Sequence, residues 1–114
     1  MGPASSGYIE CYKHTVRFNE VDPYGMVHHS VYIVWAEIGI QNYLSDAGLF
    51  TKYEIDKISC KYISPARDRD EVTVRIRLNK DSDLNEGVLF FSFEITLRNK
   101  PLTRGNISVR REDS

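Results

Sequence analysis

The segment from Val27 to Leu44 limits the fold more than any other part of the sequence. Its apolar residues lie on nearly every side of a helical wheel. A surface helix shows an apolar stripe on one side only, so a helix that is apolar all round must be wrapped by other structure. The polar exceptions, Glu37 and Gln41, are four residues apart and therefore share one face. We expect the helix to end near Gly48, because glycine commonly follows the last helical turn.

The rest of the sequence alternates between apolar and polar residues, which predicts half-buried β-strands. These strands cover residues 12–18, 53–63, 72–78 and 89–97, with a short last strand at Ile107 and Val109. The inward parity switches near Asp56 and Lys57, which predicts a bulge there. Pro101 is expected to bound the strand before it, and the polar residues 80–87 form a hairpin connection.

The order β-α-β-β-β-β predicts an α+β fold in which one antiparallel sheet of about five strands surrounds one long central helix. One helix covers only one face of such a sheet. If the other face also carries apolar side chains, a second subunit is its natural cover. We therefore expect at least a homodimer.

Composition narrows the class of protein. The 114 residues correspond to one domain, which we place at residues 8–111 between a flexible lead-in (1–7) and a short tail (112–114). The 15 Lys and Arg residues nearly cancel the 16 Asp and Glu residues, which argues against nucleic-acid binding. Because there are only two cysteines and neither a secretory signal nor a membrane-spanning apolar run, we expect a cytoplasmic protein without a membrane partner.

A motif links the first strand to the helix. The strand ends in the aromatic Phe18, followed by Asp22-Pro23-Tyr24-Gly25, an apolar pair, His28-His29, and the apolar helix carrying Glu37. This arrangement resembles the signature of the 4-hydroxybenzoyl-CoA thioesterase-like hotdog superfamily. The segment from Ile63 to Val72, with Pro65-Ala66 and Asp70, resembles that family's entry into its next strand. The resemblance implies the hotdog fold and hydrolysis of a thioester.

By this resemblance, the catalytic carboxylate falls on Asp22, acting as nucleophile or as general base. The oxyanion donor is the backbone amide seven residues later, that of His29 at the helix start, where free N–H groups and the helix dipole favour negative charge. Gly25 permits close approach of the substrate or a turn with positive φ. A structural interpretation also stands, because Asp before Pro often closes its own turn.

The side chains of His28 and His29 are candidates for holding the thioester or its water, as in one branch of the family. That branch carries a Tyr four residues before the Asp, where this sequence has Phe18. Glu37 is an alternative catalytic carboxylate on the helix. Adjacent histidines lack the i, i+4 spacing of a helical metal pair, so no metal is predicted.

Substrate contacts are expected from Tyr24, and from Arg67 and Arg69, which could meet the phosphates of coenzyme A or the phosphopantetheine arm of a carrier protein. We expect a thioesterase for acyl-CoA or acyl carrier protein that needs no cofactor and forms a homodimer or homotetramer. The alternatives are a carrier-protein-specific enzyme that releases polyketide or β-keto acyl chains, and an acyl-binding hotdog module without catalysis. A hotdog dehydratase lacks support, because its His-bearing Pro-rich motif is missing.

Overall fold

The structure is a computed structural model that describes residues 7–112, so most of the predicted lead-in and tail lies outside the described residues. Residues 7–112 form five strands, one α-helix and one 3-10 turn. In chain order these are β1 (Ile9–Thr15), η1 (Phe18–Glu20), α2 (His29–Ala47), β2 (Tyr53–Tyr62), β3 (Glu71–Leu78), β4 (Val88–Leu97) and β5 (Lys100–Arg111). This is the predicted β-α-β-β-β-β order. No helix within residues 7–112 has the length and apolar character of a membrane span.

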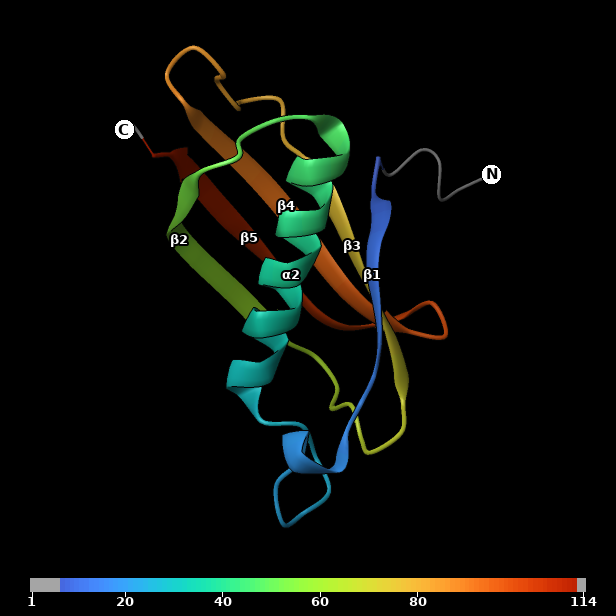
Figure 1. The fold of residues 1–114 in the computed structure, drawn as a ribbon. Coiled ribbons are helices and arrows are strands. Elements are labelled where there is room, and N and C mark those ends of the chain that lie inside the picture. The colour runs from blue at the N-terminus through green and yellow to red at the C-terminus, as the bar shows by residue number, and fades with distance from the viewer. Residues whose placement is uncertain (1–6, 113–114) are drawn as a thin grey trace.

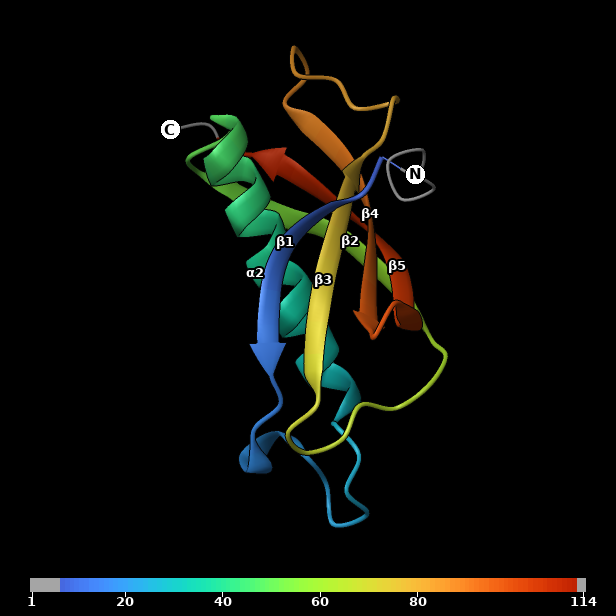
Figure 2. The same cartoon turned by 90° about the vertical axis from the view of Figure 1, so that its right-hand side faces the viewer.

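The five strands make one antiparallel sheet in the order β1-β3-β4-β5-β2. Helix α2 runs across one face of this sheet (Figure 1), and the view turned by 90° shows the sheet curving around it (Figure 2). The arrangement confirms the predicted hotdog architecture. The loops before α2 and after β2 meet at the same end of the molecule, which is where the site described below lies.

Helix α2 is buried along the side that the strands cover, with Trp35, Ala36 and Ile40 all no more than 1% exposed. Gly39 allows the closest approach, because an added Cβ would lie 2.7 Å from Val74 Cγ1 on β3. The helix ends at Gly48 as predicted, in the left-handed conformation with φ 68°. Its start is two residues later than predicted, because Val27 bridges to Val21 and donates its N–H to the Ala66 carbonyl.

The last strand differs most from its predicted extent. The bulge in β2 lies between Ile55 and Lys57 as expected, but β5 is a 12-residue strand rather than a short one. It begins before Pro101, because Arg98 and Asn99 both adopt positive φ and form a tight turn out of β4. Gly105 interrupts the apolar alternation and so hides the strand in the sequence. It is required for packing, since a Cβ there would lie 2.1 Å from the Ser59 carbonyl oxygen.

The first strand lies three residues earlier in the chain than predicted, at Ile9–Thr15 instead of residues 12–18. It ends at Thr15, so Phe18 lies in η1 with 81% of its surface exposed instead of pointing inward. Val16 remains buried as expected, and its N–H donates to the Asp70 carbonyl. The alternation that predicted a strand as far as Phe18 therefore continues into a turn, whose geometry is set by contacts outside the strand.

The face of the sheet away from α2 carries polar side chains beside Phe90, which is 37% exposed. Glu94 on β4 accepts from Arg104 Nε at 2.9 Å, and its other oxygen lies 3.8 Å from an Arg75 nitrogen. Arg77 donates to the Ser92 hydroxyl on the same face. The homodimer expected from the sequence stays a prediction, because these contacts lie within one chain.

Candidate active site

The loop between η1 and α2 is held in shape by its own backbone. Asp22 donates its N–H to the Met26 carbonyl at 2.8 Å, and Gly25 donates to the Asp22 carbonyl at 2.9 Å. Gly25 has φ 82°, a conformation that residues with a Cβ rarely adopt. This explains why the motif needs a glycine three residues after the aspartate: the turn brings residues 22 and 26 back together.

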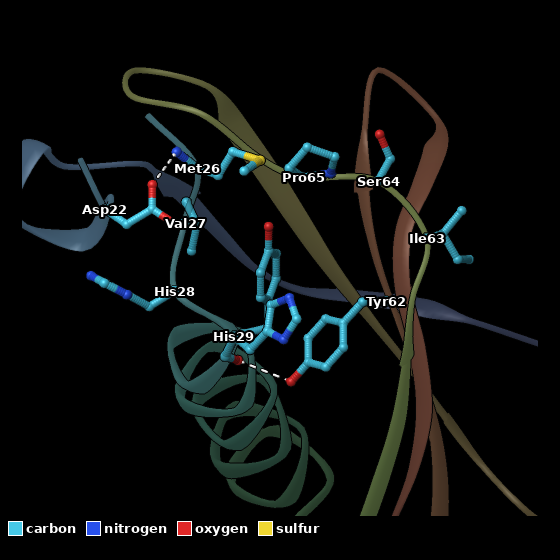
Figure 3. A pocket seen from close by; sticks show the side chains of 10 residues that line it. Asp22, Met26, Val27, His28, His29, Tyr62, Ile63, Ser64 and Pro65 are labelled. Atoms are coloured by element: carbon cyan, nitrogen blue, oxygen red, sulfur yellow. Dashed lines mark hydrogen bonds between the residues drawn. The ribbon is translucent and has the colours of Figure 1, made fainter. Parts of the chain in front are cut away.

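The two oxygens of the Asp22 carboxylate have different roles. Oδ1 accepts the N–H groups of Tyr24 at 2.8 Å and of Met26 at 3.1 Å, and the second of these bonds is drawn in Figure 3. Among the described residues, Oδ2 accepts no hydrogen bond. The turn-closing and chemical interpretations of Asp22 are thus compatible, because one oxygen fixes the loop while the other stays available.

Asp22 borders a pocket of about 390 Å³ at the N-terminal end of α2. The pocket is lined by the η1–α2 loop, the start of α2, the end of β2 and the residues after it (Figure 3). The lining residues are Asp22, Met26, Val27, His28, His29, Tyr32, Tyr62, Ile63, Ser64 and Pro65. Apolar groups and a few polar groups therefore surround one carboxylate, as in many small-molecule sites.

His29 is the first residue of α2, so its N–H has no carbonyl partner four residues earlier in the helix. It donates no hydrogen bond to residues 7–112, and the cap residue His28 makes no side-chain cap either. The positive end of the helix dipole therefore meets the same pocket as the Asp22 carboxylate. A free amide at this point can donate to an oxygen that gains negative charge.

The His29 side chain packs against Tyr62. The two rings are stacked, with centroids 3.9 Å apart and planes 11° apart, and the Tyr62 hydroxyl donates to the His29 carbonyl at 3.0 Å (Figure 3). Burial, together with the nearby Cys60 thiol, raises the pKa of Tyr62 to about 12, so the hydroxyl stays a donor at neutral pH. In Figure 3 the His28 ring points away from this pair.

Sequence reasoning did not find Tyr62 as a site residue. It lies at the end of β2, where the alternation marked it only as an inward-facing strand residue. No motif in the sequence connects it with His29, because the contact depends on where β2 ends relative to α2.

The other predicted residues are placed less centrally. Tyr24 contributes its backbone N–H to Asp22, but its side chain is 82% exposed and outside the pocket lining. Gly25 is outside this lining and borders a separate hollow beside Phe18 and Asp68. Glu37 is exposed two turns along α2 and is also outside the lining. Arg67 bridges to Met26 through the backbone, and both Arg67 and Arg69 have exposed side chains beside the loop.

Several solved structures share this fold. A probable thioesterase from Bartonella henselae aligns with a TM-score of 0.80 at 16% identity, covering 90% of each chain. A hypothetical protein from Thermus thermophilus aligns with a TM-score of 0.78 at 27% identity, covering 90% of this chain and 82% of the other. An aspartate-to-asparagine mutant of a 4-hydroxybenzoyl-CoA thioesterase, complexed with 4-hydroxybenzoyl-CoA, aligns with a TM-score of 0.80 at 14% identity over 95% and 87% of the chains.

Sequence comparison gives the family directly. A search of curated protein sequences gives no significant match. The sequence profile of the thioesterase superfamily, however, matches residues 24–82, which is just over half of the chain. The match starts two residues after Asp22 and includes the start of α2, Tyr62 and the residues that follow β2. The chain therefore belongs to the thioesterase superfamily.

Proposed function

We propose that this protein hydrolyses an acyl thioester of coenzyme A, with Asp22 as its catalytic carboxylate. The observation that carries the proposal is that Asp22 and His29 line one pocket, and that within residues 7–112 one Asp22 oxygen and the His29 N–H have no hydrogen-bond partner. Thioester hydrolysis needs these two groups: a base or nucleophile, and a donor for the oxygen that becomes negative. Membership of the thioesterase superfamily supports the same reaction.

In the general-base route, Asp22 Oδ2 takes a proton from water while the water oxygen bonds to the thioester carbon. The carbonyl oxygen becomes an oxyanion that the His29 N–H stabilises. The carbonyl then re-forms, the C–S bond breaks, and the thiolate takes the proton back from Asp22. The products are the free acid and the thiol. Such acid–base catalysis is typically worth ~10²–10⁴ in rate.

In the nucleophilic route, Oδ2 attacks the thioester carbon, the thiolate leaves, and water hydrolyses the resulting mixed anhydride. A single turnover in ¹⁸O-labelled water reveals the nucleophilic route when label stays on the enzyme. Direct attack by water places the label in the acid product, as does water addition at the acyl carbon of the anhydride. Attack by Asp22 followed by water addition at the Asp22 carboxyl carbon leaves the label on the enzyme instead.

The side chains of Arg67 and Arg69 are proposed to contact the phosphates of coenzyme A. Both are exposed next to the catalytic loop, and the bridge between Met26 and Arg67 fixes the distance of that segment from the pocket. The solved thioesterase that is complexed with 4-hydroxybenzoyl-CoA has the same fold. This likeness supports a coenzyme A ester as the substrate. An acyl carrier protein substrate, including a polyketide or β-keto acyl chain, would present the same thioester through its phosphopantetheine arm.

A homodimer is proposed from the side of α2 that the sheet leaves uncovered. Val34 is 51% exposed there, and Ile63 at the pocket edge is 46% exposed. A second subunit packed against this side would cover both residues and close the pocket. Sedimentation equilibrium of the full chain tests this: a dimer mass is expected, and a monomer at all micromolar concentrations contradicts it.

The deciding experiment measures thiol release from short, long, aromatic and β-keto acyl-CoA esters, with wild type beside Asp22→Asn. Turnover that falls about 100-fold or more in the variant supports the proposal. Turnover that survives the substitution removes Asp22 from the chemistry and directs attention to Glu37. A folded protein that releases no thiol from any CoA ester is then tested with acyl carrier protein esters, and inactivity there supports the non-catalytic binding module.

A further inference from the structure

Glu20, the last residue of η1, connects parts of the chain that are separate in sequence. Its Oε1 lies 2.8 Å from Nε2 of His14 on β1 and accepts the Arg17 N–H at 2.7 Å. Its Oε2 lies 3.4 Å from the indole nitrogen of Trp35 on α2. One carboxylate therefore ties the first strand and the central helix to the turn that begins the catalytic loop.

The backbone of Glu20 extends these connections to the start of α2. Its carbonyl accepts the His28 N–H at 3.1 Å, and His28 directly precedes the proposed oxyanion donor His29. On its other side, Glu20 is two residues before Asp22. Asp22 is thus two residues from Glu20 along the chain, and His29 follows the residue whose N–H the Glu20 carbonyl accepts. A shift of Glu20 would move the carboxylate and the amide relative to each other.

The surroundings of Glu20 and His14 set the charge of Glu20. Burial alone would raise the pKa of Glu20, but the hydrogen bonds from His14 and from the Arg17 N–H outweigh it and hold that pKa below its ordinary value. Glu20 is therefore a carboxylate at neutral pH and can only accept. It follows that His14 Nε2 carries the proton that faces Glu20.

His14 is itself held from the other side. Its side chain is only 10% exposed, its Nδ1 lies 2.9 Å from the Tyr12 hydroxyl, and its ring packs against Trp35 with centroids 5.1 Å apart. The imidazole therefore has a fixed orientation. Neither His14 nor Glu20 lines the pocket, so neither touches the substrate there.

We propose that His14 is a positioning residue: its Nε2–H holds Glu20, and Glu20 holds Asp22 and the His29 amide at the geometry that hydrolysis requires. The inference rests on the proposed thioesterase function. Small displacements of reacting groups cost rate far more than they cost binding, because alignment matters most in the transition state. Loss of the His14 donor should therefore lower kcat and leave KM nearly unchanged.

The kinetic test compares His14→Leu with His14→Gln. Leucine removes the donor, whereas the glutamine amide can place an N–H near the position of Nε2. We expect kcat to fall about tenfold in His14→Leu, with KM within about twofold of wild type. In His14→Gln we expect most of kcat to be recovered. Equal activity in wild type and both variants, or equal loss in both variants, overturns the proposal.

The control for general destabilisation is Gly48→Ala at the far end of α2, where an added Cβ meets nothing within 4 Å but the backbone has φ 68°. This variant should lose stability while keeping kcat. If it lowers kcat as much as His14→Leu at a similar loss of stability, the effect is not one of position and the proposal fails.

A second measurement does not depend on turnover. Hydrogen exchange of the His28 amide reports its bond to the Glu20 carbonyl. His14→Leu should speed this exchange about tenfold relative to core amides of α2, and His14→Gln should not. If wild type hydrolyses no thioester, the proposed function fails, and unchanged His28 exchange separately refutes the positioning role. If His14→Leu does not fold, Tyr12→Phe replaces it and should speed His28 exchange in the same direction; no change overturns the proposal.

Discussion

The two ends of helix α2 satisfy their backbone groups in different ways. At the C-terminal end, Gly48 and Leu49 turn back and donate their N–H groups to carbonyls of the last turn, at 3.2 Å to Ser45 and 2.9 Å to Leu44. At the N-terminal end no side chain caps the helix, and the His29 N–H has no partner among residues 7–112. The closed end completes a structural element, and the open end leaves a donor facing a pocket.

The comparison shows why the open end needs outside support. A glycine cap is a local device, because one left-handed residue is enough to satisfy the last carbonyls. The N-terminal end instead relies on Asp22 Oδ1, on the carbonyl of Glu20, and on the Tyr62 hydroxyl at the His29 carbonyl. We therefore expect substitutions at the open end to change activity and those at the closed end to change only stability.

The largest effect is expected at Asp22, where two substitutions separate the roles of its two carboxylate oxygens. Asp22→Ala removes both the reactive oxygen and the acceptor for two loop amides, whereas Asp22→Asn keeps an acceptor at the Oδ1 position. Both variants should lose activity about 100-fold or more, but Asp22→Ala should also lose about 1–3 kcal/mol of unfolding free energy. Urea unfolding checks this, and equal stability of the two variants would show that the loop bonds contribute nothing.

At the closed end, Gly48→Ala should cost about 1 kcal/mol, because alanine is strained at φ 68° although space is free around it. Thermal unfolding measures the loss. Thiol release per folded molecule should equal that of wild type, and a clear decrease in kcat would show that the two ends of α2 are coupled.

Tyr62→Phe should have a smaller effect. It removes the hydrogen bond to the His29 carbonyl and keeps the ring stacked on the imidazole. Because this bond is near the surface, we expect Tyr62→Phe to lose about 0.5–1 kcal/mol of unfolding free energy. Tyr62→Leu also removes the stacked ring, so comparing the two variants separates the contribution of the hydroxyl from that of the ring. A larger loss of unfolding free energy in Tyr62→Phe than in Tyr62→Leu would contradict these assigned contributions.

The smallest effect concerns acid stability. Hydrogen bonds from His14 and the Arg17 N–H hold the pKa of Glu20 below its ordinary value in the folded protein, so its contribution to stability is present above the ordinary pKa and is lost as pH falls through the lowered one. Glu20→Gln should therefore flatten the decrease of unfolding free energy in acid, below the ordinary pKa of a glutamate side chain. The difference is expected to be small, because Glu20 is one of 16 acidic residues. A steeper decrease of unfolding free energy in the variant would show that ionised Glu20 does not stabilise the folded protein.

Much of the fold could be predicted because the relevant signals are local. The apolar character of residues 27–44, Gly48 at the helix end and the parity switch at Asp56-Lys57 all correspond to features of the structure. The predicted strand limits were wrong where contacts outside the segment decide the local conformation. Phe18 continues an alternating pattern but lies in a turn, and Gly105 breaks a pattern although the strand continues through it.

For the candidate site, the sequence by itself determined the loop: Asp22 and Gly25 make a turn before a helix, and the amide seven residues after Asp22 begins that helix. The tertiary structure alone decided what surrounds the loop. The contact of His29 with Tyr62 spans 33 residues, and that of Glu20 with Trp35 spans 15. Periodicity and turn residues report the conformation of neighbours along the chain, whereas these contacts depend on how the sheet brings β1, α2 and the end of β2 together.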